Sequence, residues 1–407
     1  MRELVKFEYR KTWNKVTVFA VASMFILLTL HTFIYLNLQY NAIDENGEIV
    51  NGLQSYRELK EASEYLDGML DEKYIKDLIN DYNSSFDKKY LKEHRGYLGT
   101  AGMTKFMVPN YLINYAYYGP YMSNGNDKIG LDYDFLDSEE SFYKKYREAV
   151  KEELLSLNEW NGLFPYSEEQ ISVLEKKIEN VKTPFRVEYD QGLCNLRSWY
   201  VMDYYIFFVV LAFALACMYS KDSVSGVNEL TLSSSYGRKK NMKARWIAGN
   251  LFTLIAYLIF IGTLVLEHGA IASLHGWNAS AQTFWYECLY NINFGTGLLI
   301  MFAGGLLGAF VMANFVMLVS MITKNAKLTT AVSIIAVWLL VRFSATYSQI
   351  KLLLNPIQFK SDSLITEYLF IGNTALPYFI VVLVLTAFYV TVFQFLMKQS
   401  YKKYRLN

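Results

Sequence analysis

The sequence predicts an all-α polytopic membrane protein with six transmembrane helices and a helical extracellular domain inserted between helices 1 and 2. Composition and charge distribution predict this class. Of the 407 residues, 53% are hydrophobic and 19% are charged. Residues 40–203 hold 30 of the 38 acidic and 19 of the 39 basic residues, so the rest of the chain is apolar and basic. Such a remainder has too little polar surface for a purely soluble globular protein.

Six apolar runs are long enough to cross the ~30 Å hydrocarbon core of a bilayer as helices, which takes about 20 residues. They fall at residues 16–40, 204–219, 246–266, within 289–323, at 328–347 and at 377–397. The first run is too long for the apolar part of a signal peptide, and no A-x-A-like site follows it, so a retained helix is favoured over a cleaved leader.

Basic residues orient these helices through the positive-inside rule. They gather before the first helix, between the second and third, between the fourth and fifth, and after the sixth, whereas residues 268–293 between the third and fourth contain no Lys or Arg. Both termini are therefore expected in the cytoplasm, and the acidic segment outside. The composition suits the plasma membrane of a bacterium.

The acidic segment is predicted to be a helical domain. Apolar residues recur at spacings of three and four over 55–82 and again over 141–157. Ser167 followed by Gln170 has the form of a capping box that starts a third helix. Packing of a small domain explains these stripes, and a surface that handles a substrate is the alternative. Its net charge of −11 is compatible with attraction of cationic peptides or with ordinary solvation.

The loop between the second and third helices carries the most specific pattern. It reads SKDSVSGVNELTLSSSYGRKKNMKARW over residues 220–246, with a short amphipathic centre, a Ser- and Gly-containing turn and a basic run. Such a segment suits docking into a groove of a soluble partner, although a loop that only sets topology is the simpler alternative. The residues that carry the pattern are Asp222, Gly226, Leu230, Leu232, Ser233, Gly237, Arg238 and Arg245, and Glu229 is a further candidate for coupling to a partner.

With these residues the chain resembles the permease subunits of ABC-2-type transporters (type V exporters), in the Gram-positive variant with a large extracellular domain after the first helix. Asp222 stands where Glu is usual, and Arg245 where Lys is usual. The resemblance implies a cytoplasmic coupling helix that sits in a cleft of an ATPase subunit and transmits its closure. It also implies that residues 1–14 form an interfacial elbow helix, with Leu4, Val5, Phe7 and Trp13 in the bilayer interface.

The expected domains follow from this resemblance and from the apolar runs. They are an elbow helix (1–15), helix 1 (16–39), the extracellular domain (40–202), helix 2 (203–220), the coupling loop (221–245), and helices 3–6 with a cytoplasmic tail (246–407). Expected partners are two copies of a cytoplasmic ABC ATPase, a second permease chain that is identical or related, and membrane lipid, with no nucleic acid.

Catalytic motifs are missing from the sequence. There is no G-x-x-x-x-G-K-[ST] loop, so the chain is not expected to be an enzyme, and ATP and Mg²⁺ are expected in a separate subunit. The four histidines have no metal-ligand spacing, and Asp203 has no second intramembrane Asp to form an aspartyl pair. Whether Cys194 and Cys288 pair is left open.

Polar groups inside the apolar runs are functional candidates by default. Arg342 and Asn314 are candidates for a translocation path, although Arg342 is as well explained by snorkelling, and Asn314 by hydrogen bonding between helices. Gly304 and Gly308 have a G-x-x-x-G spacing that permits close helix packing. We expect no buried charge, which favours an amphipathic cargo over a small ion.

These features predict the membrane subunit of an ATP-driven exporter for an amphipathic substrate, such as an antimicrobial peptide or a lipid-like molecule. The alternative is a membrane-anchored sensor or resistance module, whose extracellular domain binds a peptide without transporting it.

Overall fold

The computed structural model describes residues 1–39, 41–43, 49–64, 67–85, 112, 115–116, 139–160, 165–224, 239–344 and 349–402. Within these residues, five helices are long and apolar enough to cross a membrane. They are α2 (Lys15–Gln39), α10 (Gln191–Val224), α12 (Lys239–Ala272), α13 (Phe294–Thr323) and α17 (Tyr378–Lys402). The prediction of a mostly helical, polytopic membrane protein is therefore confirmed.

The predicted fifth span, residues 328–347, coincides with α14 (Ala326–Ser344) as far as Ser344, and residues 345–348 lie outside the described residues. This helix has an exposed apolar face formed by Leu328, Ile334, Ile335, Trp338 and Leu339. The count of six spanning helices stays a prediction.

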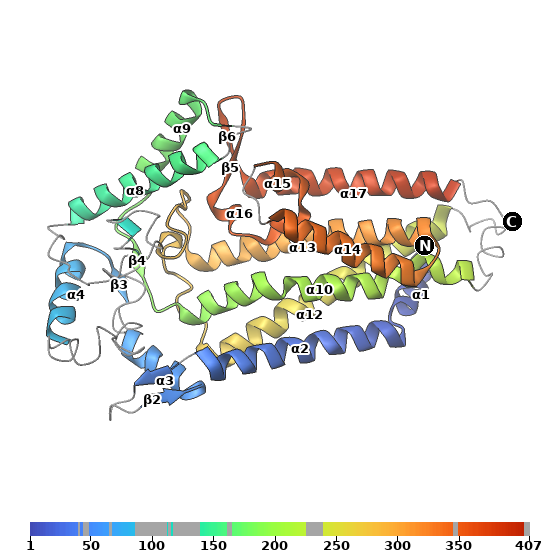
Figure 1. The fold of residues 1–407 in the computed structure, drawn as a ribbon, viewed down its shortest axis with the longest axis horizontal. Coiled ribbons are helices and arrows are strands. Elements are labelled where there is room, and N and C mark those ends of the chain that lie inside the picture. The colour runs from blue at the N-terminus through green and yellow to red at the C-terminus, as the bar shows by residue number, and fades with distance from the viewer. Residues whose placement is uncertain are drawn as a thin grey trace.

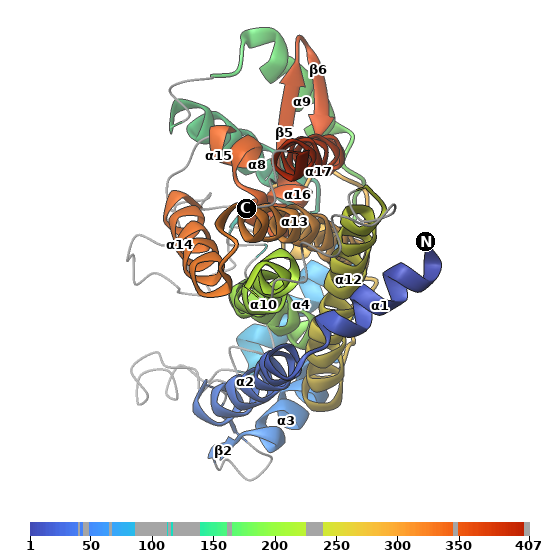
Figure 2. The same cartoon turned by 90° about the vertical axis from the view of Figure 1, so that its right-hand side faces the viewer.

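The long helices lie side by side in one bundle (Figure 1). The helix α1 (Arg2–Thr12) and the last turn of α17 lie at one end of the bundle. At the opposite end, which we call the distal end, lie α3 (Leu53–Ser63), α4 (Glu72–Ser85), α8 (Glu139–Trp160) and α9 (Glu168–Glu179). Viewed along the bundle, α10 and α13 are central, with α2, α12, α14 and α17 around them (Figure 2).

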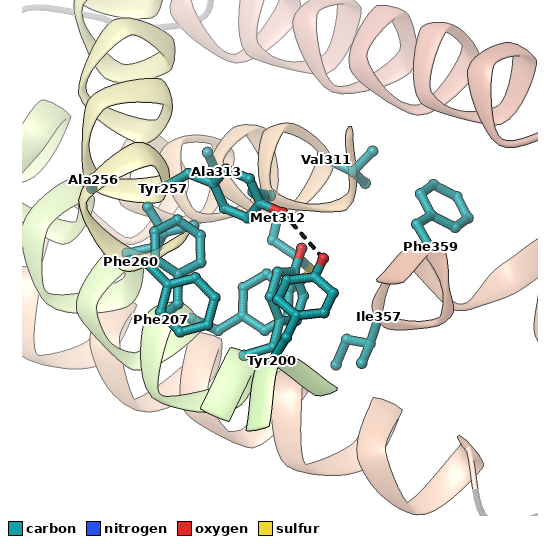
Figure 3. Close-up of a cluster of buried hydrophobic side chains, with 14 of the residues drawn as sticks. Tyr200, Phe207, Ala256, Tyr257, Phe260, Val311, Met312, Ala313, Ile357 and Phe359 are labelled. Carbon is teal, nitrogen blue, oxygen red and sulfur yellow. Dashed lines mark hydrogen bonds between the residues drawn. The ribbon is translucent and has the colours of Figure 1, made fainter. Parts of the chain in front are cut away.

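Aromatic side chains fill the space between α10, α12 and α13 (Figure 3). Three tyrosine hydroxyls of this core donate to backbone carbonyls of α13: Tyr200 to Met301 at 3.0 Å, Tyr257 to Phe302 at 2.6 Å, and Tyr204 to Gly305. The hydroxyls of Tyr200 and Tyr257 also lie 3.1 Å apart. Because hydrocarbon offers no hydrogen bonds, each buried hydroxyl needs such a partner.

The helix α10 begins at Gln191, twelve residues before the predicted boundary at residue 203. The prediction followed the apolar run and missed a polar first section whose side chains find partners outside the helix. Asn195 donates to the Tyr56 hydroxyl at 3.0 Å, and Arg197 donates to Asp362 Oδ1 at 2.8 Å and forms an ion pair with that residue. These contacts extend α10 beyond the apolar residues.

The segment between α2 and α10 contains four described helices and short strands. Its elements are β1 (Asn41–Ile43), β2 (Ile49–Asn51), α3 (Leu53–Ser63), β3 (Gly68–Met69), α4 (Glu72–Ser85), α8 (Glu139–Trp160), α9 (Glu168–Glu179) and β4 (Arg186–Val187). The capping box is confirmed. The Ser167 hydroxyl oxygen accepts from the backbone N–H of Gln170, and the side-chain oxygen of Gln170 accepts from the backbone N–H of Ser167.

The prediction of one helix over residues 55–82 is wrong, because this part of the chain forms two separate helices, α3 and α4. Between them β3 pairs antiparallel with β4, with Gly68 opposite Val187 and Met69 opposite Arg186. Asp71 then starts α4 by accepting from the Tyr74 amide at 2.8 Å. Spacing of apolar residues alone does not reveal this break, because the strand that causes it pairs with a segment more than 100 residues away.

After α14 the chain folds back along α13 through α15 (Gln349–Leu354), the 3₁₀ turn η4 (Pro356–Lys360) and α16 (Ser363–Thr366). The hairpin of β5 (Tyr368–Ile371) and β6 (Thr374–Pro377) then leads directly into α17, with Gly372 at φ +58° in its turn. The hairpin reaches α9, where the Gln170 side chain donates to Gly372 O at 2.8 Å.

Between α12 and α13, the turn η3 (Ala281–Thr283) lies in a loop that packs against the distal helices. Tyr146 of α8 donates to the Tyr286 carbonyl at 2.6 Å. All three cysteines are free, so Cys194 and Cys288 form no disulfide.

Buried Asp190 lies directly before α10, and its burial raises the pKa of this carboxyl to about 7, with the charges of Asp67 and Glu188 acting in the same direction. A raised pKa means that the folded chain binds the proton more tightly than the unfolded chain. The stabilisation is present below about pH 4 and is lost as the pH rises towards 7. Asp190 is expected to contribute a fall in stability of about 1.4 kcal/mol per pH unit in that window.

Thermal unfolding of the full chain in detergent, measured from pH 4 to pH 8, checks this. Asp190→Asn is expected to flatten the dependence, whereas Glu168→Gln, an exposed carboxylate on α9, is expected to leave it unchanged. Equal slopes for the wild type and Asp190→Asn would contradict the assignment.

Candidate functional site at the ends of α1, α10 and α12

The site lies where α1, the last turns of α10 and the first turns of α12 meet, at the end of the bundle opposite the distal helices (Figure 1). Residues 225–238, which join α10 to α12, lie outside the described residues. The candidate coupling residues among them are Gly226, Glu229, Leu230, Leu232, Gly237 and Arg238. Asp222 lies in the last turn of α10, and its side chain is not among those described.

Arg245 is the one candidate coupling residue whose side chain the structure describes, and it is 2% exposed. Its Nε lies 3.4 Å from Glu8 Oε1 of α1, and its Nη1 donates to the Met218 carbonyl of α10 at 3.4 Å. The guanidinium also lies over the Tyr219 ring, 5.6 Å from the centroid. Arg245 therefore connects α12 to both α1 and α10.

Asn241, one turn before Arg245 on α12, completes the ion pair. With its amide oriented so that the oxygen faces Arg245, it accepts from Nη2 at 3.2 Å and donates to Glu8 Oε1 at 3.1 Å. Asn241 thus gives one hydrogen bond to each partner of the ion pair, and such bonds offset part of the cost of burying two charges.

The helix α1 is fixed to the bundle at two further points. The Thr12 hydroxyl donates to Glu8 O at 2.9 Å and contacts Met218 Sδ at 3.5 Å. The Trp13 ring packs edge-on against Phe252 of α12, with centroids 5.1 Å apart. Of the four apolar residues predicted to face the bilayer interface, Phe7 is exposed, Leu4 and Val5 are partly buried, and Trp13 packs into the bundle.

Sequence reasoning missed Glu8. Its only signal was its place as one of two acidic residues, with Glu3, in the mainly basic and apolar segment 1–14. Its partner is more than 200 residues away, so local patterns do not identify it.

The remaining candidates lie elsewhere in the bundle. Gly304 and Gly308 do permit a close approach, but to η4 rather than to another long helix. A Cβ at Gly304 would lie 2.2 Å from the Phe359 carbonyl oxygen, and one at Gly308 would lie 2.6 Å from that of Pro356. Asn314 bridges α13 and α12: it accepts from Trp246 Nε1 at 2.5 Å and donates to Asn250 Oδ1 at 3.0 Å.

Arg342 lies in the last turn of α14, and its side chain is exposed. Snorkelling and an inter-subunit cavity both remain compatible with this position.

The expectation of no buried charge is wrong. Arg245, Asp203 and Lys360 are each at most 3% exposed. Asp203 lies in the interior of α10, with its carboxylate oxygens 2.9 and 3.2 Å from His31 Nδ1 of α2. Lys360 of η4 donates to the Val201 carbonyl at 2.5 Å, with the Tyr205 ring centroid 4.8 Å away. Each of these three side chains has a charged or hydrogen-bonding partner that is far away in the sequence. A single sequence does not reveal such partners.

Among the described residues, no group of three or more His, Cys, Asp or Glu side chains is arranged to hold a metal ion. Comparisons with family models, with curated proteins and with solved structures gave no match.

Proposed function

We propose that this chain is the membrane-spanning permease subunit of an ATP-driven exporter of the ABC-2 type, with six spanning helices, cytoplasmic termini and an extracellular domain. The separate ATPase subunits, present in two copies, hydrolyse ATP, and a second permease chain faces this one. The cargo is an amphipathic molecule such as a peptide or a lipid-like compound.

The observation that carries the proposal is the convergence of α1, α10 and α12 on the Glu8–Arg245 ion pair. The loop that resembles a coupling helix connects α10 to α12 along the chain. Movement of this loop by the ATPase would therefore displace the ends of both helices. Arg245 is too deeply buried to touch a soluble partner. Its role in coupling is therefore to pass movement of the loop to α1 rather than to contact the ATPase.

Because Arg245, Asp203 and Lys360 are buried in the bundle, an absence of buried charge no longer supports an amphipathic cargo over a small ion. The amphipathic cargo is proposed from the resemblance to ABC-2-type permeases. A sensor without transport is the second candidate. It is favoured by the β5–β6 hairpin, which contacts α9 and continues along the chain into α17. A movement of α9 on ligand binding would therefore reach a long helix of the bundle.

Reconstitution of the chain with its ATPase in lipid vesicles tests the proposal. We expect ATP-dependent movement of a cationic amphipathic peptide, and a loss of ATPase binding and transport of at least tenfold when Glu229 and Leu230 are both replaced by Ala. Replacement of Lys176 and Lys177 on α9 by Ala serves as a control. Peptide binding without ATP-dependent movement would support the sensor instead.

A further inference from the structure

A small cavity lies where the first distal helix, α3, meets the bundle. Its polar lining comes from four helices: Thr32 of α2, Tyr56 of α3, Asn195 of α10 and His268 of α12. Each of these four residues is at most 6% exposed. The cavity has a volume of about 10 Å³, close to the ~10–15 Å³ that one water molecule needs. The space is therefore polar, buried and large enough for one small molecule.

The tautomer of His268 follows from a contact within α12. Its Nδ1 lies 2.9 Å from the Leu264 carbonyl oxygen, which can only accept, so Nδ1 carries the hydrogen. In a neutral imidazole, Nε2 is then an acceptor. The neutral form is expected because His268 is 4% exposed and forms no ion pair with any described residue, and burial of an unpaired charge is costly.

The described part of the chain offers no hydrogen-bond donor to His268 Nε2. The other described contact of this ring is with Trp199, whose ring centroid lies 6.2 Å away. Because Nδ1 faces the backbone of its own helix, Nε2 is the nitrogen left for the cavity that His268 lines. Buried acceptors are as a rule satisfied by protein or by ordered water. A donor inside the cavity would satisfy this one.

Thr32 supplies a second acceptor at the cavity. Its hydroxyl donates its single hydrogen to Glu267 Oε2 at 3.0 Å, so its oxygen can accept. Two further lining groups bond to each other, since Asn195 donates to the Tyr56 hydroxyl at 3.0 Å. A water molecule carries two hydrogens on one atom and matches the pair of acceptors. An ammonium ion would match them too, but it would bring an unpaired charge into a buried site.

We propose that this cavity binds one water molecule, which donates to His268 Nε2 and to Thr32 Oγ1. The water links α12 to α2 beside the place where Tyr56 of α3 packs against Ile271 and Ala272 of α12. Buried waters of this kind are part of the structure and are costly to remove. The contact of the first distal helix with the bundle therefore depends on a bound water as well as on apolar packing. The site is independent of the exporter proposal.

Solid-state NMR of the full chain, with isotope-labelled histidine, tests this site in phosphatidylcholine vesicles at pH 7. The signals of His268 are identified by their loss in His268→Phe. We expect its Nε2 to carry no hydrogen and to show a contact with water protons. This contact is expected to survive a gadolinium chelate in the aqueous phase, which quenches contacts with bulk water. His275, whose side chain is 36% exposed, is the comparison, and its water contact is expected to be lost.

Filling the cavity provides the second measurement. Ala272→Val narrows the cavity and is expected to abolish the contact of His268 Nε2 with water. Ala270→Val, at an exposed position of the same helix, is the matched control and is expected to retain it.

A wild-type His268 Nε2 that carries a hydrogen, or that has no contact with water, would overturn the proposal. A contact that the gadolinium chelate removes, or one that Ala272→Val retains, would overturn it as well. The wild-type measurement decides the proposal even if Ala272→Val does not fold.

Discussion

Replacement of Arg245 by Ala is expected to destabilise the chain by about 3–5 kcal/mol, because it leaves the Glu8 carboxylate buried without its charge partner. The measurement is the free energy of unfolding in detergent, from denaturant titration. Replacement of both residues, Glu8→Leu with Arg245→Met, is expected to recover most of the loss, since a buried ion pair exchanged for apolar side chains is often neutral.

The double variant also separates stability from coupling. If Arg245 transmits movement of the loop to α1, the double variant is expected to be stable and to bind the ATPase, but to lose most ATP-dependent transport. Lys243→Ala, on the same helix and outside the ion pair, is the control. A stable double variant that transports at the wild-type rate would restrict the role of the pair to folding.

Replacement of Gly305 by Ala is expected to cost about 1–3 kcal/mol or more, because overpacking a filled core forces side chains or backbone to shift. A Cβ there would lie 1.8 Å from the Tyr200 hydroxyl oxygen and 2.7 Å from that of Tyr257. Thermal unfolding in detergent measures the loss. Tyr200→Phe is expected to restore part of it, since it removes the nearer oxygen.

Gly262→Ala is the matched control for this experiment. Gly262 is also in a long apolar helix, and nothing lies within 4 Å of a Cβ built there. We expect it to change stability by no more than about 1 kcal/mol, the helix-propensity difference between Gly and Ala. Equal losses at the two glycines would show that helix propensity, and not the close approach to Tyr200, decides the effect.

The apolar runs predicted the positions of the long helices because the length of a span and its hydropathy are local properties of the sequence. The ends were predicted less well. The helix α10 begins at Gln191 because Asn195 and Arg197 find partners far away in the chain. The separation of α3 from α4 likewise depends on the pairing of β3 with β4.

The candidate site was predicted in part. Arg245 was identified through its place in a motif, but its partner Glu8 was not, because nothing local marks the acid as buried. The same holds for His31 and Asp203, which form a pair across two helices. Charges in an apolar run look costly in a single sequence, and only the fold shows what compensates them.

The three tyrosine hydroxyls that α10 and α12 direct at carbonyls of α13 restrict how the bundle can change shape. Sliding or rotation of any one of these helices past the others would strip hydrogen bonds from groups that have no water to replace them. The three helices must therefore travel as one rigid body. Any alternation between two conformations is then expected at the borders of this unit with α1, α2, α14 and α17.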